Sequence, residues 1–265
     1  MSTVESYLQG TPAWVDLLAT DRKAAADFYG GLFAWKFRDV SGDTGDYALA
    51  LLDGDPVAGI GEKPEAEPFS AMWTTYFAVT NADSAAIRIS AAGGLLSMDP
   101  IVVTDGVTRL GRLSIAADPA GAIFGVWEAG SQPGAVRINE PGSLAWSEAM
   151  SHNATVVRRF YRAVFNWGYD QIGDGVTFDY TTASVAGRAV CGVMQIPQGT
   201  QAQLTSHWLT YFAVADTDAA AERVLELGGE VVSEPRDSQH GRFSLVQDPQ
   251  GAMFAAIQLP PGAGD

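Results

Sequence analysis

The chain is poor in cysteine, in positive charge and in long apolar runs, and each shortage excludes a class of function. Its single cysteine, Cys191, excludes an internal disulfide and a thiolate metal cluster. Lys and Arg number 16 against 31 Asp and Glu, a formal net charge of -15. That balance disfavours nucleic acid and anionic membranes as partners, because phosphates are bound by clustered Lys and Arg. Cys191 lies in the apolar segment GRAVCGVMQIP, so we expect a buried, inert thiol.

Signals for export and for nucleotide binding are also missing. No apolar run approaches the roughly 18 residues that cross a bilayer. The first ten residues, MSTVESYLQG, lack the basic start and apolar core of a secretion signal. No phosphate-binding loop, nucleotide fingerprint or nucleophile triad occurs. We therefore expect a cytoplasmic protein without membrane, nucleic-acid or nucleotide partners.

What the sequence has instead is a duplication. The first repeated block reads AWVDLLATDRKAAADFYGGLFAW, and its second copy reads AWSEAMSHNATVVRRFYRAVFNW. The repeated blocks, as first and second copy, are 13–35 and 145–167, 72–79 and 207–214, and 111–124 and 241–254. A similar offset over separate blocks cannot come from composition, so the chain is a tandem duplication. It predicts two domains of ordinary size, 1–130 and 131–265.

Each half begins with a strand, a helix and further short strands. After the N-cap Asp21, apolar residues from Ala25 to Phe33 follow the i, i+3, i+4, i+7, i+8 spacing of a buried helix face, and the pattern recurs after Asn153. A strand around Trp14 or Trp146 precedes each helix, and short strands such as 47–52 and 57–60 follow the first. This order is β-α-β-β-β.

The second part of each half repeats that order. Strands are predicted at 73–79 and 208–214, and helices at 82–92 and 219–227, each ended by a Gly-Gly pair. Asp-Pro-x-Gly turns follow at Asp118 and Asp248. Connectors rich in Gly, Pro and Glu lie around 63–70 and 130–142. The sequence thus predicts an α+β fold of four β-α-β-β-β modules.

Three of these motifs resemble the vicinal oxygen chelate superfamily, the group of glyoxalase I, bleomycin-resistance proteins, fosfomycin-resistance enzymes and extradiol dioxygenases. They are D-x-x-x-A-x-x-FY-x-x-x-F-x-W, the Y-F-A-V strand before a helix ending in GG, and the G-R-x-x-x-x-x-DP-x-G hairpin. The chain looks most like the two-domain glyoxalase-like branch. The resemblance implies paired modules that curl into a cup-shaped β-sheet, usually around a divalent metal.

The family's metal-ligand positions hold residues without suitable donors here. By the resemblance they fall at Trp14 and Trp146, Thr74 and Leu209, Gly125 and Ala255, and near Gly59 and Gly192. A divalent ion needs three or four converging N, O or S donors. We therefore expect no metal and no other cofactor, with an ion held by His207 and Glu148 as the remaining metal alternative.

Strand alternation predicts what lines the cups instead. Residues two apart on a strand share a face, so residues two positions from a family ligand position also point into the cup. The expected lining is Trp14, Asp16, Thr74, Tyr76 and Trp127 in the first half, and Trp146, Glu148, His207, Leu209, Tyr211 and Met253 in the second. Such aromatic walls suit a flat, partly apolar ligand, although they also serve as an ordinary core. An acid in a dry core needs a partner, so either the cups are wet or the acids are paired.

The three histidines differ in what they predict. His152, in a strand-to-helix loop, and His240, at a strand start, are expected at the surface. His207 is expected on an inward strand face near Glu148. A histidine and a carboxylate in one pocket can move a proton at neutral pH, so the second half is favoured for any chemistry, with Asp16 as the acid of the first.

Two classes of function follow. The first is a metal-free protein that binds an aromatic or quinone-like small molecule, as an accessory of a natural-product pathway or as a resistance or sequestering protein. The second is a metal-independent enzyme, an isomerase, cyclase or ring-modifying enzyme in which His207, Glu148 and Asp16 move protons; a metal-dependent lyase or dioxygenase and a purely structural role are weaker alternatives. Either cup, and either a monomer or a homodimer, is compatible with these functions.

Overall fold

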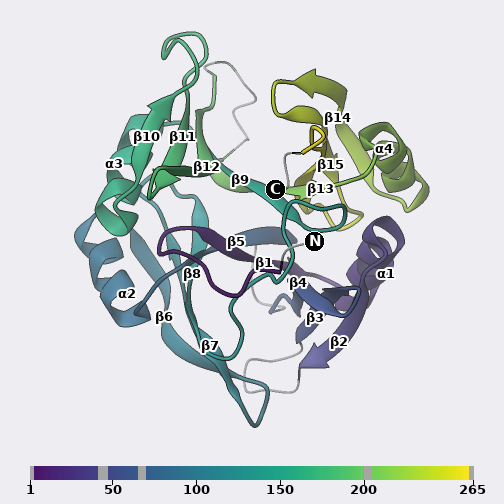
Figure 1. The fold of residues 1–265 in the computed structure, drawn as a ribbon, viewed down its shortest axis with the longest axis horizontal. Helices are drawn as coiled ribbons and strands as arrows, with labels where there is room; N and C mark the ends of the chain where they lie inside the picture. The colour runs from purple at the N-terminus through teal and green to yellow at the C-terminus, as the bar shows by residue number, and fades with distance from the viewer. Residues whose placement is uncertain (1–2, 41–46, 65–69, 198, 200–204, 263–265) are drawn as a thin grey trace.

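The computed structural model describes residues 3–40, 47–64, 70–197, 199 and 205–262. The first half contains β1 (Pro12–Ala19), α1 (Arg22–Phe33), β2 (Lys36–Val40), β3 (Tyr47–Leu52), β4 (Asp55–Glu62), β5 (Met72–Ala78), α2 (Ala82–Ala91), β6 (Leu95–Thr104), β7 (Arg109–Ala117) and β8 (Ile123–Ala129). The second half contains β9 (Leu144–Ser151), α3 (Ala154–Phe165), β10 (Gly168–Gln171), β11 (Tyr180–Val185), β12 (Arg188–Gln195), β13 (His207–Ala213), α4 (Thr217–Glu226), β14 (Glu230–Ser238), β15 (Gly241–Gln247) and β16 (Met253–Gln258). The four predicted β-α-β-β-β modules are confirmed (Figure 1).

Each half forms one curled sheet of eight strands. The orders are β2-β3-β4-β1-β5-β8-β7-β6 and β10-β11-β12-β9-β13-β16-β15-β14, which are identical under the duplication. The first strands of the two modules, β1 and β5 or β9 and β13, pair antiparallel at the centre of each sheet. The α+β fold with two tandem domains is confirmed, while the boundary between residues 130 and 131 stays a prediction. Of the predicted connector 63–70, residues 65–69 lie outside the described residues.

Local signals in the sequence fix the ends of the elements. Asp21 Oδ1 accepts a hydrogen bond from the backbone N–H of Ala24 at 2.9 Å, which caps α1, and Asn153 caps α3 in the same way. Helix α4 begins at Thr217, two residues before the predicted start, because Asp216 caps it. In the turn at Asp118, the N–H of Gly121 donates to the Asp118 carbonyl at 2.9 Å.

The helices form two cores, and each core is shared by both halves. Helix α1 packs near α4, and α2 packs near α3, on opposite sides of the molecule (Figure 1). Tyr29 of α1 donates a 3.1 Å hydrogen bond to Asp248 in the turn of the other half, and Tyr161 of α3 donates one of 3.2 Å to Asp118. These reciprocal contacts tie the two halves together.

Two further predictions concern the single cysteine and the helices. Cys191 is fully buried, as predicted. Across the part of the chain that the structure describes, no helix is long and apolar enough to cross a membrane.

Candidate functional site

The faces of the two sheets that point away from the helices form two cups. We call the inner face of the first sheet the first cup; Trp14, Tyr76 and Trp127 form its apolar floor. The second cup is the inner face of the second sheet, and its floor contains Leu209, Tyr211 and Ala255. Alternation along β1, β5, β8, β13 and β16 turns these residues inward, while adjacent residues such as Val15, Phe77 and Phe254 join the helical cores.

A hydrogen-bonded group of four side chains occupies the first cup. Trp14 Nε1 donates to the hydroxyl of Tyr47 at 3.0 Å, and that hydroxyl donates to Asp16 Oδ2 at 3.4 Å. Tyr76 also hydrogen bonds to Asp16. Asp16 is only 6% exposed, and its Oδ1 has no partner within the described residues.

The same group recurs in the second cup. Trp146 Nε1 donates to the Tyr180 hydroxyl at 3.2 Å, and the Tyr211 hydroxyl donates to Glu148 Oε2 at 2.8 Å. Tyr180 hydrogen bonds to Glu148 as well. Each cup thus holds a hydrogen-bonded group of one Trp, one acid and two Tyr, which we call the tyrosine–carboxyl cluster of that cup.

Burial favours the protonated form of both acids. It raises the pKa of Asp16 to about 7, against the opposing effect of the hydrogen bonds from Tyr76 and Tyr47. Burial also raises the pKa of Glu148, which hydrogen bonds from Tyr211 and Tyr180 partly offset. Tyrosine hydroxyls hydrogen bond to both acids, but Asp16 Oδ1 has no partner within the described residues, so the paired-acid alternative holds for Glu148 and only in part for Asp16.

Tyr47 and Tyr180 are the functional candidates that sequence reasoning missed. Tyr47 begins β3 and Tyr180 begins β11, the third strand of each half. Neither lies beside a family ligand position, so strand alternation from those positions did not predict them. The duplication holds a signal for them, because each follows an aspartate in an Asp-Tyr pair with the spacing of the other repeated blocks.

The tyrosines occupy the space in which metal-ligand side chains would stand. A Cβ on Gly125 would lie 2.1 Å from the Tyr76 ring, one on Gly59 would lie 1.7 Å from the Tyr47 hydroxyl, and one on Gly192 would lie 2.3 Å from the Tyr180 hydroxyl. Within the described residues, no three His, Cys, Asp or Glu side chains gather in a way that could hold an ion. The residues of the cups therefore do not fit the divalent metal that the fold implies.

The first cup is closed by the segment that connects the two halves. Ala135 of this connector is fully buried against the cup floor, and its N–H donates to the Ala13 carbonyl at 2.7 Å. Tyr7 of the N-terminal segment donates to the Ala135 carbonyl at 2.6 Å, and Trp127 Nε1 donates to the Gln132 carbonyl at 3.0 Å. Trp14 is only 7% exposed beneath this cover.

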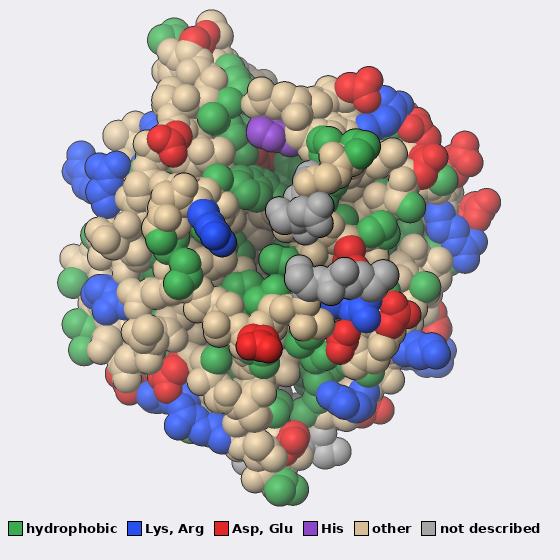
Figure 2. Space-filling view, in the orientation of Figure 1, with side chains coloured by type: hydrophobic (Ala, Val, Ile, Leu, Met, Phe, Trp, Pro, Cys, Tyr) green, Lys and Arg blue, Asp and Glu red, His purple; other side chains and the backbone are tan. Residues whose placement is uncertain are grey.

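The second cup is more open than the first at its tryptophan, because Trp146 is partly exposed whereas the equivalent Trp14 is buried. Trp146, Met150, Phe243, Leu245 and Met253 around its floor are all partly exposed. Figure 2 shows a hollow near the centre of this face, over strand β9, with apolar side chains in it and a histidine at its rim. Of the predicted lining, Trp146, Leu209, Tyr211 and Met253 thus meet in one apolar cluster around the buried Glu148.

The three histidines lie on the loop and strand positions at which they were predicted. His152 and His240 are exposed, as expected. His207 begins β13 on the inward face, and its Nδ1 lies 2.8 Å from the Thr205 carbonyl. Burial lowers the pKa of His207, which favours the neutral ring. Within the described residues it makes no hydrogen bond or ion pair with Glu148, so the structure does not bring the two into contact.

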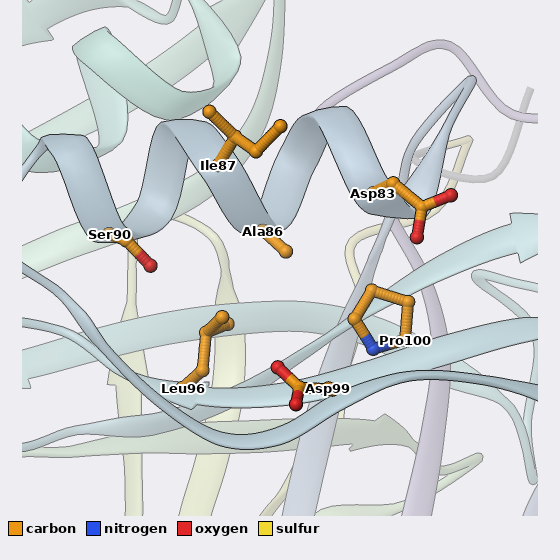
Figure 3. A pocket seen from close by; sticks show the side chains of 7 residues that line it. All are labelled: Asp83, Ala86, Ile87, Ser90, Leu96, Asp99 and Pro100. Carbon is orange, nitrogen blue, oxygen red and sulfur yellow. The ribbon is translucent and has the colours of Figure 1, made fainter.

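In the first cup, Thr74 lies directly opposite Asp16 in the β1–β5 pairing and is buried. A separate shallow groove lies outside both cups, between helix α2 and strand β6 (Figure 3). Asp83 and Ile87 of the helix and Leu96 and Asp99 of the strand border it. It is open to solvent and has no buried polar group, so the second cup remains the candidate site.

Comparisons with known proteins agree with this fold. Residues 149–257 match the family described as a glyoxalase-like domain. The chain is 36% identical to the putative glyoxylase CFP32 of Mycobacterium tuberculosis over 96% of this chain and 97% of that protein. It is also 36% identical to the anthracycline biosynthesis protein DauV of Streptomyces sp. strain C5, over 98% of each chain. The structure of the Mn(II)-bound glyoxalase from Novosphingobium aromaticivorans superposes with a TM-score of 0.63 at 16% identity, over 97% of this chain and 91% of that chain.

Proposed function

This chain belongs to the glyoxalase-like family, and we propose that it binds a flat aromatic or quinone-like small molecule in its second cup without a metal. The observation that carries the proposal is the difference between the two cups. Both hold a tyrosine–carboxyl cluster, but Ala135 covers the first cup, where Trp14 is buried, while the equivalent Trp146 stays partly exposed in the second. Partly exposed aromatic and thioether side chains around a few buried polar groups suit such a ligand.

The metal-free part of the proposal is supported by the donor set of the second cup. Glu148 is its buried acid, and its carboxylate oxygens already accept from Tyr211 and Tyr180. Leu209 and Ala255, at two predicted ligand positions, offer no side-chain donor.

The biological setting is part of the same proposal. The relative named for anthracycline biosynthesis supports a role beside an aromatic natural-product pathway, as an accessory, resistance or sequestering protein. The buried free thiol of Cys191 suits the reducing cytoplasm. We propose that the protein acts there as a monomer or homodimer with the small molecule as its partner.

Calorimetric titration with anthraquinone-2-carboxamide tests the proposal. Trp146→Ala should weaken binding by about 1 to 3 kcal/mol, a typical value for a buried aromatic anchor. Trp14→Ala is the matched control, because it changes the equivalent residue in the covered cup, and it should leave affinity unchanged. Native mass spectrometry of the purified protein should show no bound metal. Absence of binding, or a loss of affinity only in Trp14→Ala, would overturn the proposal.

A second candidate function, a metal-independent isomerase, cyclase or ring-modifying enzyme, has one observation in its favour. A neutral His207 ring and a Glu148 carboxyl that tends to keep its proton both face the second cup, so a ligand between them could lose a proton to one and gain one from the other. In that case His207→Ala should lower turnover about 100- to 10,000-fold, whereas Asp16→Asn in the covered cup should not. Full activity in His207→Ala would remove this candidate.

A further inference from the structure

We propose that the ligand of the second cup carries an anionic group, such as a carboxylate, which pairs with Arg236 at the rim while the aromatic part lies inside. This inference rests on the proposed binding function and adds the chemical class of the ligand.

Arg236 lies on the inner face of the second cup. On β14 it pairs directly with Phe243 of β15, so the two side chains share a face of the sheet. Its guanidinium carbon lies 4.7 Å from the centre of the Phe243 ring. That ring contacts Tyr211, with 6.2 Å between ring centres, and Tyr211 donates to Glu148. A continuous row of contacts therefore runs from the rim cation to the buried acid.

The charge of Arg236 acts on the second cup, where it lowers the pKa of Glu148 and of Tyr211, but no ion pair neutralises it within the described residues. Its sequence neighbour Asp237 points to the other face and pairs with Arg242 at 3.1 Å, and Arg242 also pairs with Asp218 of α4 at 2.6 Å. Within the described residues Arg236 has a ring contact and no ion pair. A guanidinium stacked on a ring keeps its N–H donors free in the ring plane, where they can bind a carboxylate through two hydrogen bonds.

The covered cup lacks this arrangement. In the duplication, Pro100 corresponds to Pro235, so Ile101 of β6 stands where Arg236 stands in β14. Ile101 pairs with Leu113 in the same register in which Arg236 pairs with Phe243. The cation and its ring thus occur in the open cup and are replaced by two aliphatic residues in the covered one, which ties the charge to ligand binding rather than to the shared fold.

The interior of the second cup does not oppose an anion. Burial favours the neutral form of Glu148, whose carboxyl group hydrogen bonds to the hydroxyls of Tyr211 and Tyr180. The neutral His207 ring at the start of β13 adds no negative charge. An anionic group at the rim therefore meets the positive charge of Arg236, and burial favours the neutral form of Glu148, the acid on which Arg236 acts.

The test compares two ligands that differ only in charge, anthraquinone-2-carboxylate and anthraquinone-2-carboxamide, by titration calorimetry at low ionic strength. The wild type should bind the carboxylate about tenfold more tightly, as expected for one charged hydrogen-bonded contact. Arg236→Gln should remove that preference by weakening carboxylate binding about tenfold while leaving carboxamide binding unchanged. Arg159→Gln, which changes an exposed arginine of helix α3 behind the sheet, should change neither affinity.

The outcomes separate the two proposals. Binding of both ligands with equal affinity, unchanged in Arg236→Gln, overturns the anionic ligand and leaves the binding function standing. Binding of neither ligand overturns both. Loss of affinity for both ligands in Arg236→Gln also overturns the proposal, because it would assign Arg236 a role in shaping the cup rather than in recognising charge.

Discussion

Tyr211 donates a 2.8 Å hydrogen bond to the carboxyl of Glu148, and the two residues come from adjacent antiparallel strands at the centre of the second sheet. Tyr76 and Asp16 stand in the same relation in the first sheet. The acid and its tyrosine have therefore been kept in both copies, although one copy is covered by the connector and the other is open. Substitutions in the two tyrosine–carboxyl clusters can therefore show how much these hydrogen bonds stabilise each cup.

Removing the hydroxyl of Tyr211 should destabilise the protein. Tyr211→Phe leaves Glu148 with Tyr180 alone as its tyrosine donor, so we expect the free energy of unfolding to fall by about 1 to 2 kcal/mol. The pKa of Glu148 should rise further, because a hydrogen bond to its charged form is lost. Urea unfolding measures the first effect.

The matched control is Tyr169→Phe. The Tyr169 hydroxyl is buried without a hydrogen-bond partner in the part of the chain described, so its removal should leave stability unchanged or raise it. Equal losses in the two variants would show that the hydrogen bond to Glu148 contributes nothing specific.

Asp16 should make the protein less stable as the pH rises. Its pKa is raised from 3.8 to about 7 in the folded state, so folding favours the protonated acid. This stabilisation is complete below about pH 4 and is lost as the pH rises to about 7, a total on the order of 4 kcal/mol. Asp16→Asn, which mimics the neutral acid, should remove the effect.

Urea unfolding of wild type and Asp16→Asn across that pH range provides the measurement, because the difference between the two isolates Asp16 from the other acids. A constant difference from pH 4 to pH 8 would contradict the raised pKa.

The two cups should differ in their tolerance of one methyl group. Gly125→Ala places a Cβ about 2 Å from the Tyr76 ring, so we expect a loss of about 1 to 3 kcal/mol from overpacking. The second cup already has Ala255 at the equivalent position, and Ala255→Gly should cost at most about 1 kcal/mol, the usual effect of glycine in a strand. Thermal unfolding of both variants compares them. A Gly125→Ala protein as stable as wild type would mean that the first cup is not filled by Tyr76.

Added metal should not stabilise the protein. Because the tyrosines fill the ligand positions, an excess of Zn²⁺ or Mn²⁺ should leave the melting temperature unchanged, since only an ion that binds the folded state raises it. Elemental analysis after dialysis should find far less than one ion per chain. A stoichiometric ion that disappears in Glu148→Gln would contradict this prediction and support the His207–Glu148 alternative.

Much of the fold could be predicted because its signals are local. Asp21 and Asn153 as helix caps and the turns at Asp118 and Asp248 depend on residues within a few positions of each other. The alternation of side chains along a strand also predicted that Trp14 and Tyr211 point inward, as the structure shows. Alternation could not predict that Tyr47 and Tyr180 contact Asp16 and Glu148, because these contacts depend on how strongly each sheet curls.

The sequence by itself determined the duplication, the four modules and the inward residues of the central strands, since these follow from periodicity and from repeated blocks. Only the tertiary structure decided which cup is open. The connector could have crossed either cup, and its course is set by long-range contacts such as the N–H of Ala135 with Ala13 and the ion pair of Arg137 with Asp55 at 2.7 Å. The tertiary structure also paired Tyr29 with Asp248 and Tyr161 with Asp118. Residues so far apart meet through the packing of whole sheets and helices, and no local pattern in the chain records that packing.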